Sequence, residues 1–136
     1  MAEDFKQAFI DEASELLSDL ELSLINLEKR PDDANIIARI FRSLHTIKGS
    51  SVMFGYPNVS EFTHNIESVF HHIRIGDIQI TKDIIDLTLL ARDQISNMLI
   101  SDETDYEQKS IVEKELITAI RKYLPESKSK NINKIN

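Results

Sequence analysis

The chain has 136 residues, a formal net charge of −7 at pH 7, and neither cysteine nor tryptophan. This length suits one domain with its own hydrophobic core, and three glycines with three prolines leave little room for the turns of an all-β fold. The lack of cysteine excludes disulfides and thiolate metal sites, and the acidic balance argues against a nucleic-acid binder.

Hydrophobic periodicity predicts five helices joined by short turns. The first ends near Arg30, because Pro31 and two turn-forming aspartates follow it. Its predicted core residues are Phe5, Phe9, Ala13, Leu16, Leu20, Leu24 and Leu27. The second helix runs from about Asn35 to Phe54, and Gly55 follows where a left-handed cap costs glycine little. Its apolar face consists of Ile40, Leu44, Ile47, Ser51 and Phe54.

The third predicted helix starts near residues 56–58, because Asn58 and Glu61 have the spacing of a capping box. Gly76 ends it. Its apolar stripe is formed by Val59, Phe62, Ile66, Val69, Phe70 and Ile73. Thr81 is the predicted N-cap of the fourth helix. The apolar positions of that helix are Ile84, Leu87, Ala91, Ile95, Met98 and Leu99.

An acidic loop is predicted from Ser101 to Glu107, before a fifth helix that Pro125 closes. The apolar positions of this helix are Ile111, Val112, Leu116, Ala119, Ile120 and Tyr123. Residues 1–124 therefore form one predicted domain. Residues 125–136 have no apolar stripe, so we expect a flexible linker or tail there. A linker to further domains and a frayed terminus both agree with this composition.

The acidic, amphipathic start of the chain differs from the basic start of a signal peptide. No apolar run approaches the roughly 18 residues that a membrane span needs. We therefore expect a cytoplasmic protein whose domain makes no contact with membrane or nucleic acid. The absence of cysteine agrees with a reducing compartment.

The most informative segment is residues 41–55, which form an apolar-periodic helix with a histidine at the edge of its stripe. His45 lies about 130° from the centre of the apolar face, so its imidazole is expected to point outward. Lys48 lies about 60° to one side of it and Gly49 about 40° to the other. Glycine inside a helix costs about 1 kcal/mol relative to alanine. We interpret Gly49 as space for a bulky partner that must reach the histidine.

A second polar group of residues lies on the third predicted helix. Its members recur at intervals of four, three and four, so they form one stripe beside the apolar one: Ser60, His64, Glu67 and His71. His45 precedes Gly55 by ten residues and Glu67 follows it by twelve. If the two helices pair antiparallel across this turn, the two side chains come nearly level. This geometry permits a contact without requiring one.

These residue types suit nucleophilic chemistry at an imidazole. A neutral imidazole has one protonated nitrogen and one free nitrogen, and only the free one can attack phosphorus. A carboxylate that accepts the proton on one nitrogen fixes the tautomer and makes the other nitrogen more nucleophilic. Glu67 fits that role. Lys48, one turn from His45, can meet phosphoryl oxygens and offset their charge.

Four blocks of the sequence carry a resemblance to a known family. Residues 45–50 read His-Thr-Ile-Lys-Gly-Ser, and the further blocks lie at residues 54–55, 59–67 and 74–81. Together they resemble histidine phosphotransfer (HPt) domains, and more narrowly the amino-terminal phosphotransfer domain of CheA-type chemotaxis histidine kinases. The resemblance covers about the first 100 residues. With the five predicted helices, the expected fold is all-α: an antiparallel, up-and-down four-helix bundle with an additional C-terminal fifth helix.

The resemblance also implies roles for single residues. His45 is the implied phosphoacceptor, Glu67 its hydrogen-bonding orienter, and Lys48 and His64 the polar neighbours of the phosphoryl group. A kinase domain using ATP would phosphorylate the histidine, and an aspartate of a CheY-like or CheB-like response regulator would receive the group. The chain has no glycine-rich phosphate loop or Walker motif. It therefore lacks a kinase core and is expected to hold no cofactor or metal, while ATP and Mg²⁺ belong to the partner domains.

Val52 departs from the family, which usually has glycine or alanine seven residues after the histidine. It lies about 20° from His45 on the helical wheel, two turns along the same surface. A branched side chain there is expected to restrict partner choice rather than abolish transfer. The surface around Val52 and Gly49 thus controls access to the histidine.

Two other functions stay open from the residues alone. The chain could be an inert helical adaptor, or a metal-binding bundle that uses His64, Glu67 and His71. The order His-x-x-Glu differs from the paired Glu-x-x-His motifs of di-metal bundles. We interpret His71 and His72 as ordinary surface residues. Aromatic and methionine positions that we assign to core filling are Met53, Phe54, Phe62 and Phe70.

Overall fold

The computed structural model describes residues 2–100 and 106–125, and over this part the chain is helical without a strand. The helices are α1 (Ala2–Lys29), α2 (Ala34–Met53), α3 (Pro57–Arg74), α4 (Lys82–Ile100) and α5 (Tyr106–Arg121). The predicted all-α class and the five predicted helices are confirmed. None of the helices in the described part is long and apolar enough to cross a membrane.

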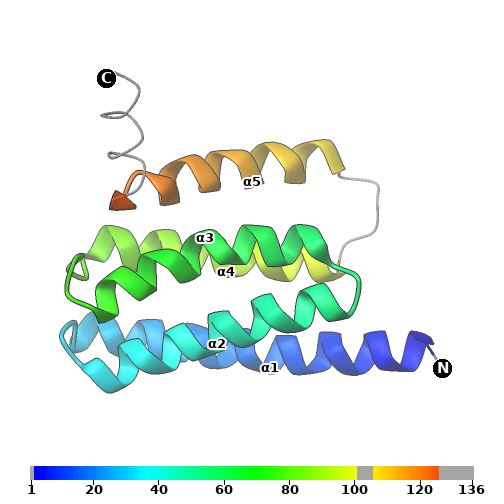
Figure 1. Cartoon of the computed structure of the whole chain (residues 1–136), viewed down its shortest axis with the longest axis horizontal. Coiled ribbons are helices and arrows are strands. Elements are labelled where there is room, and N and C mark those ends of the chain that lie inside the picture. The colour runs from blue at the N-terminus through cyan, green and yellow to red at the C-terminus, as the bar shows by residue number, and fades with distance from the viewer. Residues whose placement is uncertain (1, 101–105, 126–136) are drawn as a thin grey trace.

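The first four helices form a closed bundle (Figure 1). Each runs antiparallel to the one before it, and α1 packs against both α2 and α4 while α3 also packs against both. α5 lies outside this bundle and packs along α3 and α4. The predicted up-and-down four-helix bundle with an additional fifth helix is therefore correct.

The core is filled by the stripes that face the bundle axis. The entire predicted stripe of α3 is buried, from Val59 to Ile73. The stripe of α2 is buried through Ile40, Leu44 and Ile47. Leu17 and Ile85 are also buried, although they lie outside the predicted stripes.

Four of the predicted core positions are wrong. Phe5 is 62% exposed because α1 has 28 residues and α2 only 20, so the first turns of α1 extend past the bundle. Met53 is 80% exposed, since it lies about 220° from Ile40 around α2. Ile111 and its neighbour Val112 are exposed because α5 packs through one side only.

The helix ends follow local rules with one exception. The Asp33 side chain accepts the backbone N–H groups of residues 35 and 36 at the start of α2, and Thr81 accepts that of Ile84 at the start of α4. The predicted capping box at Asn58 is wrong. α3 already begins at Pro57 without a side-chain cap, because proline needs no partner for the missing N–H at the first helical position.

The remaining predictions concern the connections. Gly55 has φ = +88° just past the C-cap of α2, so the predicted left-handed position is confirmed. The acidic loop predicted for residues 101–107 is wrong at Tyr106 and Glu107, which belong to α5. Residues 101–105 and the tail from residue 126 lie outside the described residues.

Candidate functional site

The turn between α2 and α3 sets the register of the site. Gly55 turns the chain, and the Tyr56 N–H donates to the Ser51 carbonyl at 2.8 Å. Phe9 of α1 stacks on Phe54 with ring centroids 5.1 Å apart and contacts the Tyr56 ring at 5.5 Å. These aromatic contacts hold the turn against α1. The two helices are thereby fixed so that residues equally distant from the turn face each other.

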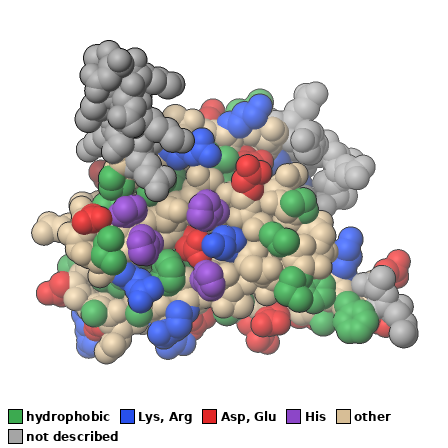
Figure 2. Space-filling view, in the orientation of Figure 1, with side chains coloured by type: hydrophobic (Ala, Val, Ile, Leu, Met, Phe, Trp, Pro, Cys, Tyr) green, Lys and Arg blue, Asp and Glu red, His purple; other side chains and the backbone are tan. Residues whose placement is uncertain are grey.

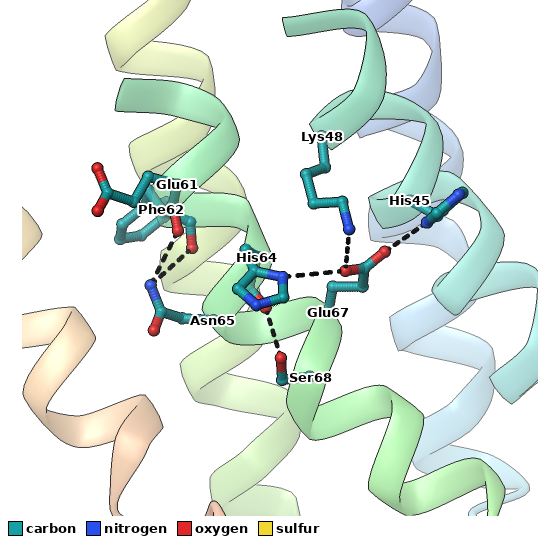
Figure 3. Close-up of polar contacts among 8 residues, drawn as sticks. All are labelled: His45, Lys48, Glu61, Phe62, His64, Asn65, Glu67 and Ser68. Carbon is teal, nitrogen blue, oxygen red and sulfur yellow. Dashed lines mark hydrogen bonds and ion pairs between the residues drawn. The ribbon is translucent and has the colours of Figure 1, made fainter. Parts of the chain in front are cut away.

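Four predicted site residues meet across α2 and α3 (Figure 3). The Nδ1 atom of His45 lies 2.6 Å from Oε2 of Glu67. Lys48 Nζ donates to Oε1 of the same carboxylate at 2.7 Å. His64 Nδ1 lies 3.4 Å from that oxygen. One carboxylate from α3 therefore organises two side chains of α2 and one of its own helix.

The side chains of Glu67 and His45 differ in their exposure to solvent. The Glu67 side chain is 7% exposed, whereas the His45 side chain is 63% exposed. Burial alone would raise the pKa of the Glu67 carboxyl, but hydrogen bonds from Lys48 and His45 outweigh it and lower the pKa below its ordinary value. Glu67 is thus ionised at neutral pH, and its charge is balanced inside the site.

The ionised carboxylate defines the tautomer of the neutral His45 ring. A carboxylate without a proton can only accept hydrogen bonds, so Nδ1 of His45 must carry the proton between them. The lone pair of the neutral ring is then on Nε2, which makes no hydrogen bond to any described residue. The site therefore presents a nucleophilic nitrogen to solvent.

The surface beside the histidine is low at Gly49. A Cβ built there meets no atom within 4 Å, so the packing of the described chain does not require a glycine. Val52 is 60% exposed on the same surface, as expected for an edge position. Neither position packs in the core. Both lie on the surface that a partner of His45 would approach.

Phe41 also borders the histidine. The two rings are nearly parallel, with centroids 6.0 Å apart and an interplanar angle of 14°. The Arg74 guanidinium of α3 lies over the Phe41 ring, 4.5 Å from its centroid. The apolar pattern assigns Phe41 no role, although its spacing of four residues from His45 is sufficient to predict this contact. Arg74 gives no comparable signal in the sequence.

The remaining histidines lie on the same face, where Figure 2 shows the histidine side chains gathered over α2 and α3. His71 is exposed, as predicted, and its ring lies 6.3 Å from that of Phe41. His72 is partly exposed, and its Nδ1 pairs at the surface with Asp77 at 3.0 Å. Within residues 2–100 and 106–125, no group of three histidine or carboxylate side chains has an arrangement suited to a metal ion.

The sequence of the chain matches a known family and several known proteins. The model of the Hpt domain family matches residues 4–102. The chemotaxis protein CheA of Borreliella burgdorferi is 40% identical over 97 residues, and that of Salmonella typhimurium is 35% identical over 125 residues. These matches cover 71% and 92% of the present chain, but 11% and 19% of the relatives. The chain therefore spans less than a fifth of the length of either relative.

A solved structure shares the arrangement of the helices. The CheA phosphotransferase domain from Thermotoga maritima superimposes with a TM-score of 0.68 at 33% sequence identity. The match covers 71% of the present chain and 91% of that domain. The helical bundle that positions the site is therefore the architecture of a phosphotransferase domain.

Proposed function

This chain belongs to the Hpt domain family, and we propose that it carries a phosphoryl group on His45. The observation that supports this most strongly is the 2.6 Å contact between His45 Nδ1 and the buried carboxylate of Glu67. It places the proton on one nitrogen of an exposed ring and leaves the other free. An ordinary surface histidine needs no buried carboxylate behind it.

The proposed reaction has two transfers. Nε2 of His45 attacks the γ-phosphorus of ATP bound to a kinase domain, the bond to the bridging oxygen breaks, and ADP leaves. Glu67 stabilises the positive charge that develops on the ring, and Lys48 offsets the incoming phosphoryl charge. An aspartate oxygen of a response regulator then attacks the same phosphorus. The phosphorus–nitrogen bond breaks, and its electron pair returns to Nε2.

The partners follow from the same proposal. The kinase is a CheA-type ATP-binding domain, and the acceptors are receiver domains of the CheY-like or CheB-like kind. ATP and Mg²⁺ act on those partners, so the present domain needs no cofactor or metal of its own. We place the protein in the cytoplasm, with residues 1–124 as the phosphotransfer domain and residues 125–136 as a linker or tail. The similarity to short parts of CheA proteins supports the proposal that this domain belongs to a longer kinase.

Labelling tests the proposal. The 136-residue chain is incubated with a CheA-type kinase core and radiolabelled ATP, beside His45→Gln and the control His71→Gln. We expect an acid-labile, base-stable label on the wild type and the control, and none on His45→Gln. Undiminished labelling of His45→Gln would contradict the assignment. If the wild type takes no label and His45→Gln still binds a response regulator, the chain is an adaptor instead.

A further inference from the structure

The His45 ring has two neighbours, and the proposed chemistry uses only one of them. Glu67 holds Nδ1 through a hydrogen bond, but a single hydrogen bond still allows the plane of the ring to tilt about the line that joins donor and acceptor. The side chain is 63% exposed, so packing confines little of its surface. A second restraint is needed to fix where Nε2 points.

Phe41 has the position to supply that restraint. Helical side chains lean toward the preceding turn, so the His45 ring extends over the residue four positions earlier. The two rings lie 14° from parallel with centroids 6.0 Å apart, within the range over which aromatic pairs attract each other. A flat hydrocarbon face beside an imidazole allows sliding but opposes tilting. The direction of the hydrogen bond and the plane of the ring are then both defined.

Phe41 is itself held from the facing helix. The Arg74 guanidinium lies 4.5 Å from its ring centroid, within the range of a cation–π contact. Arg74 belongs to the last turn of α3, and Glu67 lies two turns earlier on the same helix. Both restraints on His45 therefore come from α3, one directly and one through Phe41.

From these contacts we infer that Phe41 is a positioning residue for His45, and that Arg74 keeps Phe41 in place. The inference rests on the proposed function and adds two residues to it. In this role Phe41 needs no contact with the phosphoryl group or with ATP. It limits the ring orientations from which Nε2 can attack in line, which is the geometric condition for fast phosphoryl transfer.

Nuclear magnetic resonance of the free chain tests the restraint without any kinase. Ring relaxation and long-range ¹H–¹⁵N spectra of His45 are compared among the wild type, Phe41→Leu, Phe41→Tyr and Arg74→Gln. We expect Phe41→Leu, which keeps an apolar side chain but removes the flat face, to lower the order parameter of the ring. Phe41→Tyr should retain it, and Arg74→Gln should lower it less than Phe41→Leu does.

Labelling kinetics with the kinase core and ATP test the consequence. We expect Phe41→Leu to lower kcat about fivefold or more while the KM of the kinase core for the chain changes less than about twofold, because orientation rather than binding is lost. Arg74→Gln should lower kcat by a smaller factor. Arg42→Gln is the matched control, because Arg42 is an exposed arginine beside Phe41 whose side chain makes no hydrogen bond, ion pair or ring contact with another described residue. It should behave as the wild type.

Each outcome decides the inference. An unchanged order parameter of the His45 ring in Phe41→Leu overturns it. An effect of Phe41→Leu that lies entirely in KM, or an equal loss of kcat in Arg42→Gln, overturns it as well. If Phe41→Leu does not fold, the surface variant Arg74→Gln carries the same comparison, and a wild-type result for it overturns the inference. If the wild-type chain takes no label at all, the proposed function fails, whereas the relaxation data still decide whether Phe41 restrains the ring.

Discussion

Glu67 combines near-complete burial with a negative charge. Burial alone would raise the pKa of its carboxyl, but hydrogen bonds from Lys48 and His45 lower it overall. A lowered folded-state pKa means that the ionised site stabilises the fold above the pKa of the unfolded chain. That contribution is lost as pH falls through the lower, folded-state value. The charge on Glu67 is therefore maintained throughout the pH range in which phosphoryl transfer would occur.

The substitution Glu67→Gln should leave the helical fold intact and slow the labelling of His45. The neutral amide can also donate a hydrogen bond, so it holds the reactive tautomer less firmly. We expect a kinetic loss of about tenfold or more, as is typical of positioned acid–base groups. Initial rates with the kinase core measure it, with Glu61→Gln on the exposed side of α3 as the control. Equal rates for all three chains would mean that Glu67 does not orient the imidazole.

Gly49→Ala separates stability from access. The added methyl group meets no described atom within 4 Å, and alanine favours a helix by about 1 kcal/mol over glycine. The free energy of unfolding in urea should therefore rise by up to about 1 kcal/mol. Transfer of the phosphoryl group to a regulator should slow, because the methyl group stands where a partner approaches His45. A more stable chain with unchanged transfer would show that no partner uses this space.

Val52→Ala should act in the opposite direction. Val52 is exposed, and a β-branched side chain in a helix has a nearly fixed rotamer that cannot move aside. Removing its two methyl groups should speed transfer to at least one response regulator. The change in unfolding free energy should stay within about 1 kcal/mol, because the side chain buries little area. If every regulator in a panel accepts the phosphoryl group at the same rate from Val52→Ala as from the wild type, the steric explanation is refuted.

At the scale of the helices, some N-cap residues can be predicted from the sequence and others cannot. Asp33 and Thr81 accept backbone N–H groups at the starts of α2 and α4, whereas Asn58 lies inside α3 and caps nothing. A capping box at Asn58 and a start at Pro57 both agree with the sequence. The structure decides between them, because the turn at Gly55 leaves only Tyr56 before the helix.

Paired substitutions test this difference. Asp33→Ala should lower the free energy of unfolding by about 1 kcal/mol, the usual cost of a lost N-cap. Asn58→Ala should change it by less than about 0.5 kcal/mol, as an ordinary exposed helical position does. Urea denaturation followed by circular dichroism measures both. A loss at Asn58 as large as that at Asp33 would make Asn58 the N-cap and place the true start of α3 at Val59, two residues later.

Hydrophobic periodicity predicts the inward stripes well where a helix is packed along its whole length. It predicts α3 completely, from Val59 to Ile73. It fails at Phe5 and Ile111, because the period gives the face of a helix but not how far the neighbouring helices extend. Helix length and the one-sided packing of α5 are properties of the assembled bundle, so the sequence of one helix does not contain them.

At the scale of the whole molecule, the site depends on contacts between helices. His45 and Glu67 could be placed near each other by counting residues from Gly55, since the helices that carry them are joined by a short turn of residues 54–56. The clamp of Arg74 on Phe41 could not, because it depends on the reach of a long side chain from the last turn of α3. Sequence spacing thus locates a backbone position, whereas the reach of a long side chain appears only in the structure.

The docking of α5 on the bundle should respond to pH through Glu113. Burial and the nearby charge of Glu61 raise the pKa of the Glu113 carboxyl. A raised folded-state pKa contributes stability below the unfolded-state pKa, and this contribution is lost as pH rises through the folded-state value. Glu113→Gln should therefore stabilise the chain at pH 7 by less than about 1 kcal/mol, because solvent screens the partly exposed group.

Urea denaturation at several pH values measures this effect. The gain from Glu113→Gln should disappear below the ordinary pKa of glutamate, where the carboxyl of the wild type is also neutral. Glu115→Gln, an exposed glutamate on the same helix, serves as the control. A gain that is independent of pH would mean that the charge of Glu113 does not oppose the docking of α5.

The central claim is that Glu67 keeps the proton on Nδ1 of His45, so that phosphorus binds to Nε2. The most direct measurement is a ¹H–¹⁵N and ³¹P magnetic resonance spectrum of the ¹⁵N-histidine-labelled chain after phosphorylation by a kinase core. We expect one phosphohistidine, at His45, with the phosphorus coupled to Nε2 and with Nδ1 still protonated. Phosphorus on Nδ1 of His45, or on any of His64, His71 and His72, would contradict this account.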